Sequence, residues 1–184
     1  MEYFVLQVQT RGEARILKLA RAGMRIAGLD EENYGRLIFP QRTLTIRRRG
    51  KTRTETAAIY PGYIFIEAEK LEPELYWALR PIQGIYKFLK SNTNIEPLHG
   101  EDRRTLLHFL EHGETVAASR VVFDENNRIL VKEGPLKGLE GRIVKVDKRK
   151  RRAKVRLSVY ENSFMVDFGF ELIQTAAENE KEEK

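Results

Sequence analysis

The residues with the clearest chemical potential are twelve Lys and Arg side chains between positions 128 and 156, where only three Asp or Glu residues occur. The 184-residue chain as a whole carries a net charge of +6 and has a pI of about 9.5. The net charge of this segment, +9, is therefore larger than the net charge of the whole chain. Positive charge gathered in one place is typical of phosphate binding, and the resulting affinity falls steeply with salt. The segment predicts a polyanionic partner.

The spacing within this segment indicates a strand with one basic face. Over residues 154–160, Val155, Leu157 and Val159 alternate with polar residues, so the apolar side chains are expected to point inward. Cations and an aromatic ring on the outer face suit a nucleic acid with an exposed base. The candidate binding residues, which the resemblance given below assigns to RNA, are Lys148, Arg149, Lys150, Arg151, Arg152, Lys154, Arg156 and Tyr160. A solvated hairpin tip is the alternative interpretation.

A second basic cluster surrounds Gly50 and predicts another hairpin turn. Its cations are Arg47, Arg48, Arg49, Lys51 and Arg53. From charge alone, a solubilising hairpin explains this cluster as well as a nucleic-acid contact does.

One enzymatic pattern occurs, because His108, Glu111 and His112 match the H-x-x-E-H motif of some zinc proteases. The helical spacing argues against a metal site, since the neighbouring apolar residues form the buried stripe and leave both histidines toward solvent. No enzyme activity, cofactor or metal is expected, and a zinc hydrolase is kept only as the rival that metal analysis would test.

The amino-acid composition excludes several classes of protein. The chain has no cysteine, which excludes disulfide scaffolds, thiolate zinc fingers and cysteine nucleophiles. No apolar run approaches the roughly 18–20 residues of a membrane span, and the first residues lack the pattern of a signal peptide. A cytoplasmic protein is expected, with no membrane partner.

The elements that must position these residues fall into two groups. Residues 1–113 alternate strands and helices: strand 3–9, helix 12–28, extended segments 36–46 and 54–67, helix 73–79, strand 84–89 and helix 101–112. That order predicts an α/β sandwich on a mainly antiparallel sheet.

From residue 121 the texture changes to short strands separated by turn signals, which predicts a small antiparallel β-barrel. The fold class is therefore α+β. The expected domains are 1–113 and 121–175, joined by a linker at 114–120 and followed by a disordered charged tail at 176–184.

Several motifs carry a resemblance to a known family. GPLKGLEGRIVKVDKRKRRAKVRLSVYENSFMVDFGFELI is similar to a KOW domain, which has an SH3-like barrel. YFVLQVQT, IYPGYIFIE and IQGIYKFLKSN resemble, in order and spacing, the N-terminal (NGN) domain of the NusG family of transcription elongation factors. The short linker and the basic KOW hairpin resemble the LoaP branch of specialised antiterminators.

The resemblance implies function and partners. The N-terminal domain would bind RNA polymerase through Tyr63, which matches the family's FPGY-type motif, with Tyr60 beside it. Phe65 is a further candidate, for which a place in the sheet core is the favoured alternative. The 47–53 tip would lie near upstream DNA. The KOW domain would bind a nascent RNA hairpin or a protein, such as termination factor Rho or the ribosomal protein NusE. A monomeric processive antiterminator is expected, and a ribosome-associated RNA-binding KOW protein is the alternative.

Overall fold

The computed structural model describes residues 1–48, 50–89 and 95–173. The helices of this part are α1 (Glu13–Ile26), α2 (Glu31–Tyr34), α3 (Pro73–Leu79), α4 (Gly100–Leu110) and a 3-10 turn, η1 (Glu140–Arg142). The strands are β1 (Glu2–Val8), β2 (Arg36–Ile38), β3 (Gln41–Arg48), β4 (Lys51–Ala58), β5 (Tyr63–Ala68), β6 (Ile85–Leu89), β7 (Thr115–Val116), β8 (Ser119–Phe123), β9 (Ile129–Glu133), β10 (Ile143–Asp147), β11 (Arg152–Val159) and β12 (Asn162–Leu172).

The chain forms two compact units. Unit 1 contains Met1–Pro40 and Ala58–Leu110, and unit 2 contains Gln41–Ala57 together with the chain from Glu111 onward. The β3–β4 ribbon thus belongs to the same unit as the C-terminal strands, although its residues lie within the first third of the sequence.

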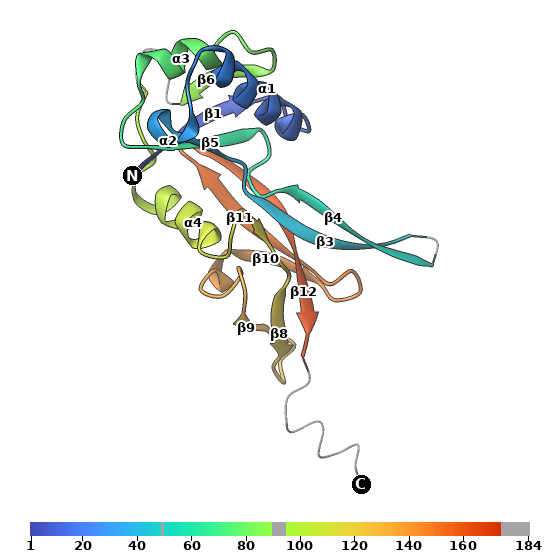
Figure 1. The fold of residues 1–184 in the computed structure, drawn as a ribbon. Coiled ribbons are helices and arrows are strands. Elements are labelled where there is room, and N and C mark those ends of the chain that lie inside the picture. Colours follow the sequence, from blue (N-terminus) through green and yellow to red (C-terminus); the bar gives the residue numbers. More distant parts are fainter. Residues whose placement is uncertain (49, 90–94, 174–184) are drawn as a thin grey trace. The chain divides into compact units, whose positions relative to one another are not determined.

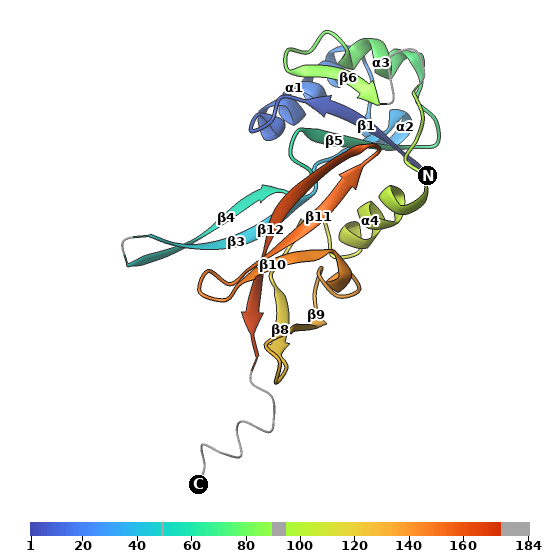
Figure 2. The same cartoon turned by 180° about the vertical axis from the view of Figure 1, so that it is seen from behind.

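Unit 1 is built on the antiparallel sheet β2–β5–β1–β6. Phe4, Leu6 and Val8 alternate along β1 and point into the main core. That core also takes Ile16 from α1 and Leu75 from α3, so these two helices cover one face of the sheet (Figures 1 and 2). The strand predicted at residues 3–9 is present as β1, and its alternation buries this face against the amphipathic helices.

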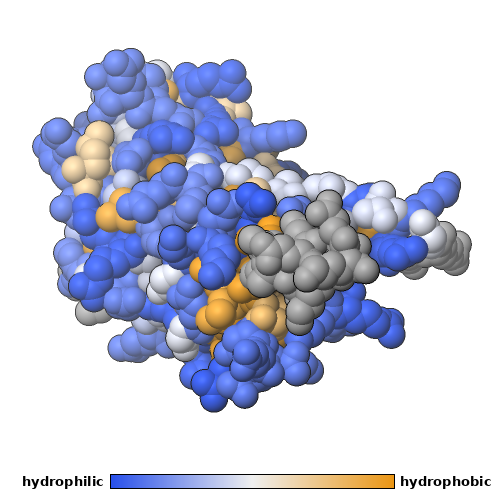
Figure 3. Space-filling model, turned by 90° about the horizontal axis from the view of Figure 1, so that it is seen from below, coloured by the Kyte–Doolittle hydropathy of each residue, from blue (hydrophilic) through white to orange (hydrophobic). Residues whose placement is uncertain are grey.

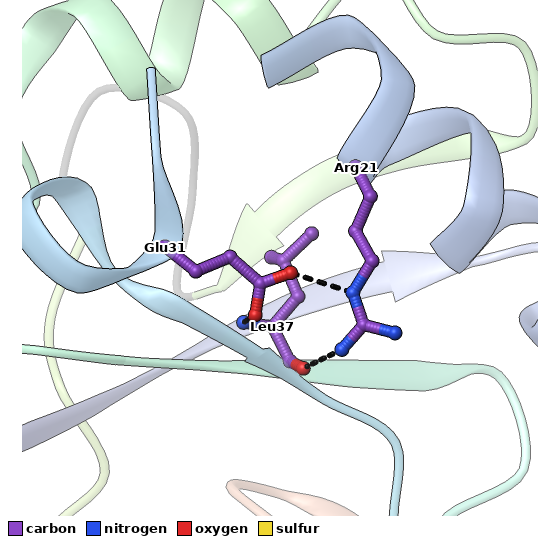
Figure 4. Close-up of polar contacts among 3 residues, drawn as sticks. All are labelled: Arg21, Glu31 and Leu37. Carbon is purple, nitrogen blue, oxygen red and sulfur yellow. Dashed lines mark hydrogen bonds and ion pairs between the residues drawn. The ribbon is translucent and has the colours of Figure 1, made fainter. Parts of the chain in front are cut away.

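A polar contact fixes the connection from α1 to the sheet edge. Arg21 donates through Nε to Glu31 Oε1 at 2.6 Å and through Nη2 to the Leu37 carbonyl at 3.1 Å. The other carboxylate oxygen of Glu31 accepts the Leu37 amide at 3.3 Å, so one ion pair ties α1, α2 and β2 together (Figure 4). Arg21 therefore has a structural role.

The opposite face of the unit 1 sheet is covered as well. Tyr60 packs edge-on against Phe65, with ring centroids 5.0 Å apart, and against Phe109 of α4, at 6.2 Å. Leu106 and Phe109 supply the buried side of α4. Burial of both faces explains why β5 reads YIFIEA in the sequence, without strict alternation.

Unit 2 contains a curled sheet with the strand order β10–β11–β12–β8–β9 (Figures 1 and 2). Neighbouring strands are antiparallel except for β12 and β8, where Phe170 pairs with Ser119 in parallel. The 11 residues of β12 allow this arrangement, because its first part pairs with β11 and its last part with β8.

The predicted α+β class is confirmed, and three local expectations need correction. The extended segment 36–46 is two strands, because Pro40 lacks an amide hydrogen to continue the ladder. The segment 54–67 is interrupted by a turn in which the Tyr63 amide bonds to the Tyr60 carbonyl at 3.1 Å and Gly62 has φ +85°. Pro61 before such a glycine is typical of a type II turn.

The helix expected over 101–112 ends at Leu110. The expected tail, 176–184, lies outside the described residues.

Candidate nucleic-acid interface

The basic run at 148–152 lies in a tight turn between β10 and β11. Asp147 accepts the Lys150 amide at 2.9 Å, and the Arg151 amide bonds to the Lys148 carbonyl at 3.2 Å. Arg151 has φ +52°, a left-handed conformation that non-glycine residues adopt infrequently. The acidic residue at the start of the turn thus orders the backbone that carries the cations.

The predicted parity of β11 is confirmed. Ala153, Val155, Leu157 and Val159 are buried, whereas Lys154 and Ser158 are half-buried and Arg156 is exposed. Because successive side chains of a strand point to opposite faces, the basic side chains of β11 line up on the outer face.

Four of the predicted RNA-binding cations already have partners inside unit 2, and we call them the engaged cations. Lys148 Nζ donates to Asn127 Oδ1 at 2.7 Å and lies 3.8 Å from the centre of the Phe123 ring. The other three are Lys150, 3.9 Å from Asp147, Arg152, which donates to the Thr45 carbonyl at 2.8 Å, and Lys154, 3.0 Å from Asp167.

The remaining three are Arg149, Arg151 and Arg156, which we call the solvent-facing arginines. All three are exposed, and no ion pair is recorded for them within the described part of the chain. Exposed guanidinium groups keep their hydrogen-bond donors available for phosphate oxygens. The predicted binding set therefore divides into residues that hold the unit together and residues that are available to a ligand.

Tyr160 lies outside that strand register, in the two-residue connection between Val159 and Asn162. It has φ +52° and is half-buried. Its ring is therefore at the end of the basic face of β11, and its place there is set by the turn and not by strand alternation.

The sequence analysis did not single out Arg42, which has a structural role beneath the basic surface. Its side chain is buried, donates through Nε to the Asp167 carbonyl at 2.5 Å and lies 5.7 Å from the centre of the Phe168 ring. Burial lowers the pKa of Arg42 to about 10, an effect that Asp167 opposes and Arg152 reinforces, so the guanidinium stays charged at neutral pH. Arg42 and Arg152 together attach the β3–β4 ribbon to β11 and β12.

The ribbon presents its own cations. Arg47, Lys51 and Arg53 are exposed, and Arg53 pairs with Glu55. The side chains of Arg48 and Arg49, two of the candidate DNA contacts, lie outside the described residues. Figure 3 views the molecule from below, and the face that it shows is largely hydrophilic, with smaller hydrophobic areas.

The candidate polymerase contacts lie in unit 1 and are buried there. Tyr60 is 1%, Phe65 0% and Tyr63 6% exposed. Burial also raises the pKa of the Tyr63 hydroxyl. The turn that carries them is anchored by Glu13, whose carboxylate accepts the Gly62 amide at 2.8 Å.

The net positive charge of the chain lies in unit 2. Residues 41–57 and 111–184 contain 21 Lys and Arg against 15 Asp and Glu, a net charge of +6. Residues 1–40 and 58–110 contain 12 of each and are neutral. Long-range attraction of a polyanion is therefore a property of unit 2.

The comparison with known families identifies the fold. The model of the family described as "Transcription termination factor nusG" matches residues 1–107. The chain belongs to the NusG family. The transcription termination/antitermination protein NusG of Vibrio vulnificus is 22% identical over 169 residues, which is 91% of this chain and 92% of that protein. The NusG protein of Borreliella burgdorferi is 29% identical over 136 residues, 69% of this chain and 73% of that one.

A solved structure has the same fold. The structure titled "Domain interaction in Thermotoga maritima NusG" matches with a TM-score of 0.59 and 18% identity, covering 91% of this chain and 93% of that one. NusG-family proteins are transcription termination/antitermination factors and not enzymes.

The structure gives the H-x-x-E-H pattern no metal-binding geometry. The described residues contain no group of three or more His, Cys, Asp or Glu side chains able to hold a metal ion. Glu111 and His112 lie in the turn that directly follows α4. No helix among the described residues combines the length and apolar character needed to cross a bilayer.

Proposed function

We propose that this NusG-family protein is a processive antiterminator of the LoaP type, in which unit 1 binds RNA polymerase and unit 2 binds a nascent RNA hairpin. The observation that carries the proposal is that the net charge of +6 lies in unit 2, whereas unit 1 is neutral. Simultaneous engagement of both would raise the local concentration of unit 1 at polymerase. Such a protein works in the cytoplasm, as a monomer.

RNA binding by unit 2 rests on the three solvent-facing arginines, which carry charge outward without a recorded carboxylate partner. Phosphate neutralisation by such groups releases counterions, so the affinity should depend strongly on salt. In unit 1, Tyr60 and Phe65 would shape the polymerase-binding face from inside, and Tyr63 would lie nearest to it. The cations of the ribbon would contact upstream DNA.

The experiment is transcription in vitro on a template with a terminator, with and without an upstream leader that forms an RNA hairpin. Read-through should rise when both protein and leader are present. The variant Arg149→Gln/Arg151→Gln/Arg156→Gln should lose this effect. Lys132→Gln/Lys137→Gln/Lys145→Gln removes the same charge elsewhere in unit 2 and serves as the matched control.

Three outcomes would contradict the proposal. Equal read-through with and without the leader would remove the role of RNA recruitment. Retention of the effect in the arginine variant, together with capture of Rho or NusE by unit 2, would favour a protein partner. Recovery with ribosomal particles and not with polymerase would favour the ribosome-associated alternative.

A further inference from the structure

Unit 2 contains a groove whose lining includes Arg156 but none of the other predicted binding residues. Its volume is about 530 Å³, and its lining includes Arg142, Val144, Arg156, Ser158 and Ser163. Pockets of about 300–1,000 Å³ hold small ligands or parts of larger ones. The groove is open, so a segment of a longer molecule can enter it.

The strand lengths explain why the groove exists. β10 begins at Ile143, which pairs with Val155, and its register shifts before Lys145. β11 continues from Val155 to Val159, and β10 offers no partner to these last residues. η1, which precedes β10, forms the wall beside this part of β11.

The groove has the chemistry of an anion site. Its lining contains two guanidinium groups, those of Arg142 and Arg156, and no carboxylate. Arg142 is half-buried, so its side chain has less freedom to move. Arg156 is exposed to solvent. Paired guanidinium groups match the oxygens of a phosphate better than isolated lysines do.

The remaining lining groups suit a sugar. Ser158 and Ser163 are opposite each other in the β11–β12 register, and both residues line the groove. A hydroxyl group both donates and accepts, as does the ribose 2′-OH that separates RNA from DNA. Val144 is 51% exposed, and Met165, opposite Arg156 on β12, is 45% exposed, so apolar surface for a base lies nearby.

We propose that this groove binds one nucleotide of a single-stranded RNA segment, with Arg142 and Arg156 on its phosphate and the hydroxyls of Ser158 and Ser163 on its ribose. The proposal rests on the proposed function and extends the RNA path from the β10–β11 turn along β11. Arg152 and Arg156 are four residues apart, about 13 Å along a strand. It also makes unit 2 selective for RNA over DNA.

Affinity measurements on the full chain test the phosphate contact. A short labelled single-stranded oligoribonucleotide and its deoxy counterpart serve as probes, with titrations at several salt concentrations. Arg142→Gln should weaken RNA binding about tenfold and reduce the salt slope by about 0.7, the value for one phosphate on a single strand. Lys137→Gln, which removes one charge outside the groove, is the control.

The sugar contact needs a separate variant. Ser158→Ala/Ser163→Ala should bring the ratio of RNA to DNA affinity to about one and leave the salt slope unchanged. A ratio equal to that of the unmodified chain would overturn the assignment of the hydroxyls.

A thiol footprint gives a readout that does not depend on affinity. Because the chain has no cysteine, Ser163→Cys introduces a single thiol. Its alkylation rate should fall at least tenfold under saturating RNA, whereas that of Lys137→Cys should change less than twofold. Equal alkylation rates of Ser163→Cys with and without RNA would contradict RNA binding in the groove. If the unmodified chain binds neither the oligoribonucleotide nor the hairpin leader of the transcription assay, the proposed function fails; if it binds RNA and all groove variants behave like their controls, only the groove fails.

Discussion

At the scale of single residues, the main result is the division of labour among neighbouring cations. Lys148 and Arg149 are adjacent, yet one lies over an aromatic ring and the other is exposed without a recorded ion pair in the described structure. A charge run in a sequence cannot distinguish them, because partners such as Asn127 and Thr45 come from distant segments. Neutralising the whole run would therefore mix loss of binding with loss of structure.

Arg42 gives the sharpest prediction at this scale. Arg42→Ala removes a charged hydrogen bond and a contact with the Phe168 ring, and should lower the free energy of unfolding of unit 2 by about 2–4 kcal/mol. Urea denaturation measures the change. Arg47→Ala, an exposed position on the same strand, should stay within about 0.5 kcal/mol. Equal effects of the two variants would show that Arg42 does not attach the ribbon.

Several residue placements were predictable from sequence and others were not. The alternation of Val155, Leu157 and Val159 fixes the faces of β11, because period two is a local property. The role of Arg42 depends on a contact with Asp167, 125 positions later, which no local pattern records. Burial of Tyr60 likewise depends on Phe109, so a motif could locate the turn but not the exposure of its rings.

At the scale of elements, turns determine how the strands of unit 2 meet. Gly134 has φ +98°, and a Cβ added there would lie 2.8 Å from the Cα of Ser119. The Ser119 hydroxyl also accepts the Leu136 amide at 2.9 Å, so the turn after β9 is fixed to the start of β8. The sequence placed glycines near this bend, but only the structure shows which one is in close contact.

A matched pair of glycines tests this packing. Gly134→Ala should destabilise unit 2 by about 2–4 kcal/mol, because it adds a steric clash to an unfavourable left-handed conformation. Gly138 has φ +84° and open space around it, so Gly138→Ala should cost only about 1 kcal/mol. Urea midpoints give both values. Equal losses would mean that backbone conformation alone, and not contact with Ser119, governs the site.

Short elements were harder to predict than long ones. α2 has four residues, and its start is marked by Asp30, whose carboxylate accepts the Asn33 amide at 2.8 Å. That capping signal was present in the sequence. The two-residue β7 has no such signal, since it is defined by its parallel pairing with β3.

At the scale of the whole molecule, the chain enters unit 2, returns to unit 1 and enters unit 2 again. The point of departure is narrow, because the Ile59 amide bonds to the Pro40 carbonyl at 2.9 Å within unit 1. The ribbon is thus an insertion whose two ends meet in one unit while its body packs in the other.

Excision of the ribbon tests this description. Replacing residues 41–57 by two glycines should leave unit 1 intact and weaken unit 2, which loses the contacts of Arg42 and Thr45. Hydrogen exchange should show unchanged protection of β1 and β5 and faster exchange in β11 and β12. Unchanged protection in β11 and β12 would contradict the assignment of the ribbon to unit 2.

The interrupted path of the chain has a consequence for synthesis on the ribosome. When the ribbon has been synthesised, residues 58–173 are still to be translated, which takes on the order of ten seconds at about 5–20 residues per second. During that interval Arg42 is hydrated, because Phe168 and the carbonyl that will accept its hydrogen bond do not yet exist. The Arg42 guanidinium therefore loses its hydration only when β12 has been synthesised and folded. The β3–β4 ribbon is packed into unit 2 at the same step.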